Sequence, residues 1–333
     1  MERLPWVPTI PTQRGSARAS LWQESGSSNQ EAPIRLSGEV IGTAVGSGDP
    51  ARIAIGRQLS FDVLETKGTN TVPVAVSFDK GMGMFDLNGK KAIVTGGNKG
   101  LGLGMSQALC KQGASVVIIG SSEVTYTCAE TLRAAGYEAD GVVCDLGNKE
   151  ELEQGFAQAL EIHEGRLDIL VNNAGVQRRA KAEEFSWEDW RFVLQVNLDA
   201  VFLLCQLAAR VMLKQGAGKI INIASMLSYF GGITVPAYAA SKGAIAQLTK
   251  ALCNEWAGRG ICVNAIAPGY MDTEMNVNLI NDEKRYTDIT ERIPTGRWGT
   301  ADDMQGIVVF LASESSNYVN GAIIPVDGGY LAK

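Results

Sequence analysis

The octapeptide TGGNKGLG, residues 95–102, lies between the apolar run KKAIV (90–94) and a segment of helical character that extends to Gln112. Glycines at a turn from a strand into a helix let the backbone approach a pyrophosphate, which then sits at the helix N-terminus. A glycine-rich turn without a ligand is the alternative reading. The position directly after a strand and before a helix favours nucleotide binding.

Outward from this turn, short apolar runs alternate with helical segments. The expected strands are KKAIVTG (90–96), ASVVIIG (114–120), YEADGVVCD (137–145), LDILVNNAG (167–175), GKIINIAS (218–225), GICVNAIAPG (260–269) and AIIPVDGG (322–329). The expected helices are 101–112, 124–135, 149–164, 187–214, 236–256 and 300–311. Such Val/Ile runs indicate parallel strands buried on both faces. We therefore predict an α/β fold with a doubly wound, seven-stranded parallel sheet of Rossmann type, which binds ligands at the carboxyl ends of its strands.

The helix expected at PAYAASKGAIAQLTKALCNEW (236–256) carries a candidate proton-transfer pair. Its apolar residues recur at helical spacing and are expected to face a core: Ile245, Leu248, Leu252 and Trp256. Tyr238 and Lys242 stand one turn apart on the same face. A phenol ionises near pH 10, and a neighbouring ammonium favours its ionised form. Ser225, thirteen residues before Tyr238, could hydrogen-bond the same substrate oxygen, although a Tyr and a Lys at this spacing also occur by chance.

Composition excludes several classes of partner. The chain has 333 residues, 45% of them hydrophobic, and a formal net charge of −6, which gives no case for nucleic acid or an anionic membrane. No run reaches the ~18 apolar residues that a spanning helix needs, and the N-terminus lacks a secretory pattern. Arg3, Arg14 and Arg18 weakly resemble a transit peptide, but nearby prolines argue against one. We expect a cytoplasmic protein.

Cysteine and histidine offer little for catalysis. The six cysteines form no C-x-x-C pair and sit mostly in apolar runs, which is typical of buried reduced thiols. His163 is the single histidine, so a Ser-His-Asp site or a histidine-rich zinc site would depend on it alone. Its helix neighbours look like a solvated face, and we interpret it as structural. No metal site is predicted.

Residues 1–83 differ from the rest. Met1 to Pro33 lacks a sustained period and suggests disorder. Short β-prone pieces follow from Ile34 to Phe78, and they could form a small β unit that buries little surface alone. The segment is an accessory module, a fusion remnant or sequence ahead of a later start at Met82 or Met84. We assign it no function.

From Phe85 to Lys333 the chain resembles the short-chain dehydrogenase/reductase family. The spacing G-x-x-x-G-x-G in the glycine turn first points to this family. Further motifs agree in order and separation: TGGNKGLG, the turn Asn172-Asn173-Ala174-Gly175, Asn197, Ser225, Tyr238-x-x-x-Lys242, and Pro268-Gly269 with Thr273. The resemblance implies a domain at 84–333 that binds a nicotinamide dinucleotide.

The resemblance implies a role for each matched residue. Tyr238 would be the acid in carbonyl reduction and the base in alcohol oxidation, and Lys242 would lower its pKa and bind the nicotinamide ribose. Ser225 would polarise the substrate oxygen. Asn197 would anchor a water that links Lys242 to solvent, although a helix-interior Asn that bonds a nearby carbonyl is also compatible. The implied cofactor contacts are Gly96, Asn98, Lys99, Gly100, Leu101, Gly102, Ser121, Asp145, Leu146, Asn173, Ala174, Gly175, Tyr238, Lys242, Pro268, Gly269 and Thr273.

The choice between NADP(H) and NAD(H) depends on the end of the second strand. An acidic residue there would bind the ribose 2′-hydroxyl and repel a 2′-phosphate. This chain has Gly120 followed by Ser121 and Ser122, and Lys99 could pair with a 2′-phosphate as a basic residue there does in NADP-using relatives. Glu123 could instead take the ribose contact, and Lys99 could be a solvated turn residue. The sequence slightly favours NADP(H) and leaves NAD(H) open.

The second half of the chain resembles the sugar-acid dehydrogenases of the family, in stretches such as NEWAGRGICVNAIAPGYM and RIPTGRWG. A carboxylate substrate calls for a cation near the cleft. Arg178 and Arg179 follow the NNAG turn, and Arg297 lies in GRWG. Salt bridges at the surface or between subunits explain these arginines equally well. Ser225 and Tyr238 complete the predicted substrate contacts.

Residues 271–296 resemble the mobile helical lid of the family, which would close over the substrate and exclude water. Tyr229, Phe230 and Tyr270 are expected to supply pocket walls. Two other functions stay open: a 3-oxoacyl thioester reductase, which would need a basic docking surface, and an idle nucleotide-binding scaffold, which would normally lack part of the catalytic set. Family resemblance also implies a homotetramer or homodimer.

Overall fold

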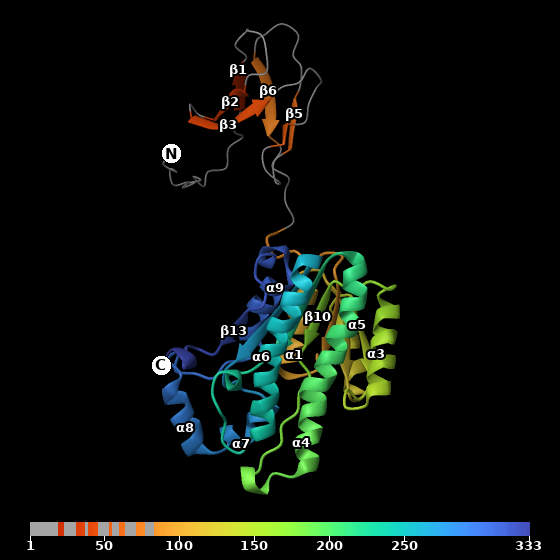
Figure 1. Cartoon of the computed structure of the whole chain (residues 1–333), viewed down its shortest axis with the longest axis vertical. Coiled ribbons are helices and arrows are strands. Elements are labelled where there is room, and N and C mark those ends of the chain that lie inside the picture. The colour runs from red at the N-terminus through yellow and green to blue at the C-terminus, as the bar shows by residue number, and fades with distance from the viewer. Residues whose placement is uncertain are drawn as a thin grey trace. The chain divides into compact units, whose positions relative to one another are not determined.

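The computed structural model describes residues 83–333 and, before them, six short strands at 19–22, 31–36, 39–45, 53–54, 60–63 and 71–76. The chain divides into two compact units, 1–81 and 82–333. In the first unit these strands are β1 to β6 in chain order, and they pair antiparallel in the order β3-β2-β1-β6-β5-β4. Figure 1 shows the strands of this unit. The disorder predicted for Met1–Pro33 falls on residues that, apart from the strands named above, lie outside the described part of the chain.

The second unit contains the predicted seven-stranded parallel sheet. Its strands are β7 (Lys91–Thr95), β8 (Ser115–Gly120), β9 (Ala139–Val143), β10 (Ile169–Asn172), β11 (Gly218–Ile223), β12 (Ile261–Pro268) and β13 (Ile323–Val326). They lie in the order β13-β12-β11-β10-β7-β8-β9, and every neighbouring pair is parallel. The direction of winding reverses between β7 and β10. A crevice at that reversal is where a doubly wound sheet binds its ligand.

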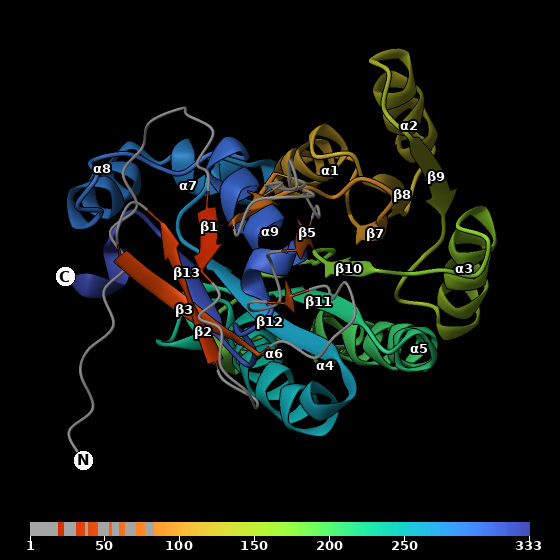
Figure 2. The ribbon, with the colours of Figure 1, turned by 90° about the horizontal axis from the view of Figure 1, so that it is seen from above.

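Helices cover both faces of the sheet, as Figure 2 shows. The helices of the layers are α1 (Gly100–Lys111), α2 (Val124–Ala134), α3 (Lys149–Ile162), α4 (Trp187–Leu194), α5 (Ala200–Gln215), α6 (Pro236–Trp256) and α9 (Gln305–Ala312). One buried cluster joins α1, α2 and α9 to one face of the sheet, and another joins α3, α5 and α6 to the opposite face. Each predicted helix is present, but the one expected at 300–311 begins five residues later, at Gln305, and the one expected at 187–214 is divided by a π-helical turn at Gln195–Asp199.

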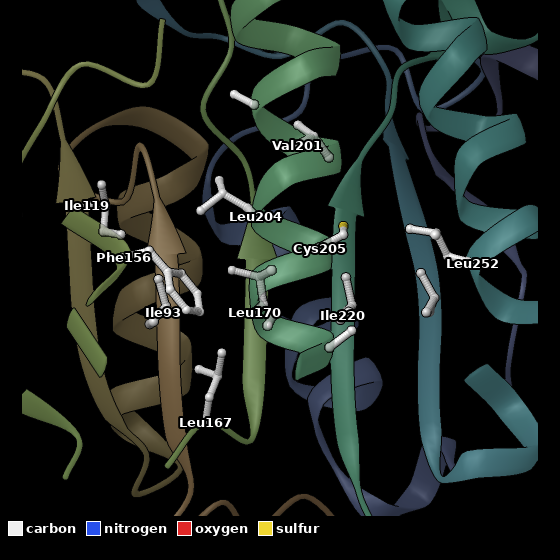
Figure 3. Packing of buried hydrophobic residues seen from close by; sticks show 14 of the residues in the cluster. Ile93, Ile119, Phe156, Leu167, Leu170, Val201, Leu204, Cys205, Ile220 and Leu252 are labelled. Atoms are coloured by element: carbon white, nitrogen blue, oxygen red, sulfur yellow. The ribbon is translucent and has the colours of Figure 1, made fainter. Parts of the chain in front are cut away.

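The core between α5 and the sheet is filled by aliphatic and aromatic side chains (Figure 3). Leu204 and Cys205 of α5 point toward Leu170 and Ile220 on the strands, while Phe156 comes from α3. All five are at least 96% buried. Burial of this apolar area is the main stabilising contribution to the layer packing.

The continuous helical run Trp187–Gln215 has the length and apolarity of a membrane span. Half of its apolar window is nevertheless buried inside the domain. Its inner face contributes Leu204 and Cys205 to the core described above. We therefore interpret it as a core helix.

His163 caps the end of α3 and is fully buried, so its expected place on a solvated face is wrong and its structural role is supported. Its Nε2 lies 3.5 Å from Ser115 Oγ, and its Nδ1 has no hydrogen-bond partner in the part of the chain that the structure describes. Burial, followed by the charge of Lys91, lowers the pKa of His163 to about 4, against the opposing effect of Asp168. The folded chain thus resists protonation of this ring.

We expect the lowered pKa of His163 to make the stability of the fold sensitive to mild acid. Between pH 6.5 and 4 the unfolded chain takes up a proton at His163 and the folded chain does not, so stability falls as the pH falls through this window. The loss is about 3 kcal/mol when complete. Replacing His163 by Gln should flatten this part of the profile, as measured by urea unfolding of both proteins across the window. Equal slopes for the two proteins would contradict the assignment.

Candidate active site

The glycine turn leaves an open backbone cradle at the N-terminus of α1. Gly96 and Gly100 have φ angles of +61° and +51°, which favour glycine. A Cβ at Gly102 would lie 2.0 Å from the carbonyl oxygen of Gly96. Only a glycine therefore lets the first turn of α1 pack this closely on the glycine turn, and the main-chain N–H groups at the start of α1 fit the pyrophosphate of a dinucleotide.

The NNAG turn is fastened directly to this cradle. Thr95 and Asn172 are register partners at the ends of β7 and β10. The Thr95 hydroxyl accepts hydrogen bonds from the main-chain N–H groups of Asn173 (3.0 Å) and Ala174 (3.1 Å). The Asn173 amide in turn donates to the carbonyls of Thr95 and Gly96, both at 3.0 Å. Thr95 was missed as a site residue, although it opens the quoted motif.

The helix α6 brings Lys242 to the same place. Its Nζ donates a 2.7 Å hydrogen bond to the carbonyl of Ile223 and lies 5.6 Å from the centroid of the Tyr238 ring. A Cβ on Gly175 would lie 3.8 Å from this Nζ. Ser225 follows β11, and its hydroxyl caps the short helix at Met226–Ser228 by accepting from Leu227 N–H at 3.1 Å. The predicted phenol, ammonium and hydroxyl therefore meet beside the NNAG turn.

Burial sets the ionisation of this group. It raises the pKa of Tyr238, while hydrogen bonding by Ser225 and the charge of Arg179 act in the opposite direction. Burial also lowers the pKa of Lys242 to about 8. In this structure the cost of burying a charge outweighs the expected lowering of the phenol pKa by Lys242. A counter-charge or hydrogen-bonding ligand in the crevice would shift this balance.

Asn197 is buried in a π-helical turn, Gln195–Asp199, that joins α4 to α5. Its Oδ1 accepts from Val176 N–H (2.8 Å), and its Nδ2 donates to the carbonyl of Val176 (2.9 Å) and to Ser241 Oγ (3.2 Å). The side chain therefore clamps the segment after the NNAG turn onto α6. Single π turns are common at functional sites.

The remaining predicted cofactor contacts line the ends of three strands. Pro268 ends β12, and Gly269 approaches β13 so closely that a Cβ would lie 2.6 Å from Asp327 Cα. Thr273 lies near the glycine turn, with its methyl 3.8 Å from the Cβ position of Gly100. Two further predicted contacts, Asp145 and Leu146, follow β9, and the Asp145 carboxylate accepts from Gly147 N–H at 2.8 Å.

The end of β8 is tightly packed around Gly120. A Cβ there would lie 2.3 Å from Thr125 Oγ1 and 3.1 Å from Asn98 Nδ2. Asn98 donates to Thr125 Oγ1 at 3.3 Å, which holds the glycine turn against this strand end. Ser121 follows and is exposed. The neighbouring Lys99 forms a 2.7 Å ion pair with Glu274, a partner that no spacing in the chain predicts.

The structure separates the three candidate arginines. Arg178 pairs with Asp189 at 3.2 Å and covers the ring of Phe192, and Arg297 makes two 2.8 Å hydrogen bonds to Asp303. Arg179 has no acidic partner within 4 Å among residues 83–333. Its pKa is lowered first by burial and then by the charge of Arg285, while Tyr270 and Tyr238 raise it. Arg179 is thus the candidate whose pKa responds to the phenols of Tyr270 and Tyr238.

The segment predicted to be a lid contains α7 (Val277–Ile280) and α8 (Glu283–Arg292) after the short helix Glu274–Asn276. A third apolar cluster seats these helices against the turn that follows Ser225; its buried members are Met226, Leu279, Ile289, Ile293, Trp298 and Tyr330. Phe230 and Tyr270 pack on Tyr330 with ring centroids 5.8 and 5.3 Å apart. Tyr229 instead is half exposed, and its hydroxyl donates to the carbonyl of Ile323 at 2.7 Å.

A hollow of about 190 Å³ opens at the lid between Asp272, Ile280, Tyr286 and Trp298. A larger one of about 320 Å³ lies at the start of α6, where Phe185, Trp187, Trp190 and Pro236 are among its lining residues. Tyr238 lines neither of them. The site is therefore defined by the convergence of the strand ends, the glycine turn and α6.

Comparison with known proteins finds a matching family model, similar curated relatives and similar solved structures. A family model described as enoyl-(acyl carrier protein) reductase matches residues 96–331. A 2-dehydro-3-deoxy-D-gluconate 5-dehydrogenase from Bacillus subtilis is 52% identical over 75% of this chain and 97% of its own length. A gluconate 5-dehydrogenase from Gluconobacter oxydans is 41% identical over 74% and 96%. The crystal structure of a gluconate 5-dehydrogenase from Burkholderia cenocepacia, in complex with NADP and tartrate, matches with a TM-score of 0.73 at 41% identity, over 76% and 99% of the two chains.

Proposed function

The chain belongs to the short-chain dehydrogenase/reductase family, and from this premise we propose that it interconverts a ketone and a secondary alcohol on a sugar acid with NAD(P) as cofactor. The specific activity proposed is that of a 2-dehydro-3-deoxy-D-gluconate 5-dehydrogenase, the name of the Bacillus subtilis relative. Gluconate 5-dehydrogenase activity is the alternative. The carrying observation is that Tyr238 and Lys242 on α6 meet the NNAG turn beside the glycine cradle.

The cofactor proposal rests on the cradle and on the NADP held by the Burkholderia relative. The main chain of Gly96 to Gly102 would hold the pyrophosphate at the N-terminus of α1. Lys242 would bind the nicotinamide ribose, and Asn173 to Gly175 would line the adenosine side of the crevice. The bound cofactor supplies or accepts the hydride. NADP(H) is favoured, because the end of β8 carries Gly120 rather than an acidic residue and Lys99 lies nearby.

The protein residues manage the proton. Tyr238 would donate its phenolic proton to the substrate oxygen during reduction and remove one during oxidation. Ser225 would hydrogen-bond the same oxygen and stabilise the charge that develops there. Lys242 would favour the ionised phenol when it carries its own proton. The seated lid would keep bulk water from the reacting atoms.

For the substrate carboxylate we propose Arg179, because Arg178 and Arg297 already bind Asp189 and Asp303. The pKa of Arg179 responds to the phenol of Tyr238, and Arg179 is without an acidic partner within 4 Å in the described residues after Gly83. A charge-assisted hydrogen bond to a carboxylate contributes about 1.5–3 kcal/mol. The tartrate in the Burkholderia relative is a carboxylate ligand of that protein.

Replacing Arg179 by Gln is therefore expected to raise KM for the keto acid by about 10- to 100-fold, with a smaller effect on kcat. Arg178→Gln is the matched comparison, since it removes the same charge one residue away, and should change KM by less than about threefold. Steady-state kinetics on both variants tests this. Equal effects of the two substitutions would rule out a specific carboxylate contact at Arg179.

The activity is tested by supplying the purified protein with NADPH or NADH and 2,5-diketo-3-deoxygluconate, 5-keto-gluconate or acetoacetyl thioesters. Turnover of the keto acids is expected. Turnover of the thioester alone would favour the second candidate, a 3-oxoacyl thioester reductase. The family model is itself described as an enoyl-(acyl carrier protein) reductase. No turnover with any of them would contradict the proposal.

Three further parts of the proposal concern the whole chain. We place the activity in residues 84–333 and propose a cytoplasmic protein that assembles as a homotetramer or homodimer. Apolar side chains that are exposed on the helices α4 and α5, Trp187 at 68% and Phe202 at 46%, support assembly. A monomeric mass in light scattering would contradict assembly. Loss of activity on removal of residues 1–83 would contradict the domain assignment.

A further inference from the structure

An ion pair links the glycine turn to the beginning of the lid. Lys99 Nζ lies 2.7 Å from Glu274 Oε2, and the two residues are 175 positions apart in the sequence. Lys99 directly precedes α1, and Glu274 follows Thr273, whose methyl approaches the Cβ position of Gly100. The pair therefore joins the glycine turn before α1 to the start of the predicted lid.

The same lysine lies on the adenosine side of the crevice. Its neighbour Asn98 touches the end of β8, where its amide is 3.1 Å from the Cβ position of Gly120. In a doubly wound fold the ribose of the adenosine sits beyond the second strand, which is β8 here, and its 2′-substituent faces the residues at that strand end. A 2′-phosphate would therefore come within reach of Lys99, which already forms an ion pair with Glu274.

On the premise of the proposed function, we infer that Glu274 competes with the 2′-phosphate of NADP for Lys99. NAD has no such phosphate and leaves the ion pair in place. Glu274 would thus lower the preference of the enzyme for NADP over NAD, and the start of the lid would be tied to the glycine turn in the NAD complex and released from it in the NADP complex.

The energetics suit an exchange. The two side chains are 69% and 80% exposed, and an ion pair between such groups contributes little to stability. A phosphate group carries nearly two charges and three acceptor oxygens, so it can displace a carboxylate from an exposed ammonium. The displaced Glu274 carboxylate would also repel the phosphate from close by. Both effects weaken NADP binding and neither acts on NAD.

The test is isothermal titration calorimetry of the full chain with NADP⁺ and NAD⁺, at one fixed salt concentration. Glu274→Gln is expected to tighten NADP⁺ by about two- to fivefold and to leave the Kd of NAD⁺ within about twofold. Lys99→Met should weaken NADP⁺ by about tenfold or more, with NAD⁺ little changed. The fragment pair 2′,5′-ADP and AMP, which differs by the 2′-phosphate alone, should respond to Glu274→Gln in the same order.

Glu283→Gln is the matched control, because the carboxylate of Glu283 also lies in the predicted lid and is exposed. This carboxylate forms no ion pair within residues 83–333. It should leave both affinities within about twofold. Equal tightening by Glu283→Gln, equal tightening of NAD⁺ by Glu274→Gln, or an unchanged NADP⁺ affinity would each overturn the inference while the proposed function stands. If the unaltered chain bound neither dinucleotide, the proposed function would fall as well.

Discussion

Replacing Tyr238 by Phe is expected to lower kcat by about 10²- to 10⁴-fold while NADP⁺ binds with an affinity within about threefold of the original. The substitution keeps the ring that lies beside Lys242 and removes only the hydroxyl that would exchange a proton with the substrate oxygen. General acid–base catalysis by a positioned side chain contributes a factor of this size. Initial rates with a keto sugar acid and calorimetric titration with NADP⁺ measure the two quantities separately.

Tyr318→Phe is the control for this experiment, because its side chain is fully exposed and lies far along the chain from α6. It should turn over at the original rate. If Tyr238→Phe were as active as Tyr318→Phe, the phenol of Tyr238 would not be the proton donor. If instead the variant failed to bind NADP⁺, the loss of activity would reflect a damaged crevice rather than a missing proton.

Much of the fold follows from local sequence patterns. The helix α6 begins and ends at the predicted residues, because Pro236 favours the first helical position and the apolar residues after it keep helical spacing up to Trp256. The middle residues of the strands beside the glycine turn are apolar, Ala92–Val94 in β7 and Val116–Ile119 in β8, and this is what burial on both faces requires. Burial of His163 was missed because its charged helix neighbours gave no hint of a buried C-cap.

The parts of the site that sequence could not supply depend on contacts between distant segments. No spacing rule connects Lys99 with Glu274, and nothing near Arg179 in the sequence indicates its interaction with Tyr238. The π turn around Asn197 has no distinct apolar period, so it was read as ordinary helix. Sequence motifs predict which residues reach the crevice. The side chains that these residues contact there depend on tertiary packing.

The second large effect is expected from Lys242→Met, which should lower kcat by about 10²-fold or more and at the same time stabilise the fold at neutral pH. The activity falls because the phenol loses its cationic neighbour. The stability rises because the ammonium is 4% exposed and its pKa is lowered to about 8, against 10.5 for the free side chain. Below pH 8 the folded chain carries this buried charge at a cost of about 3 kcal/mol. Loss of the hydrogen bond to Ile223 offsets about 1 kcal/mol of the gain.

The sign of the pH dependence makes the experiment specific. Between pH 8 and 10.5 the unfolded chain still binds a proton at Lys242 and the folded chain does not, so the unsubstituted protein gains stability as the pH rises through this window. The advantage of Lys242→Met should be about 2 kcal/mol at pH 7 and should disappear by about pH 10.5. Urea unfolding at several pH values measures it. Lys250→Met, on the same helix but exposed, should show neither the loss of activity nor the gain in stability. If Lys242→Met were inactive but no more stable at pH 7, the charge on Lys242 would cost no stability. Burial would then not be what shifts the pKa values of Tyr238 and Lys242.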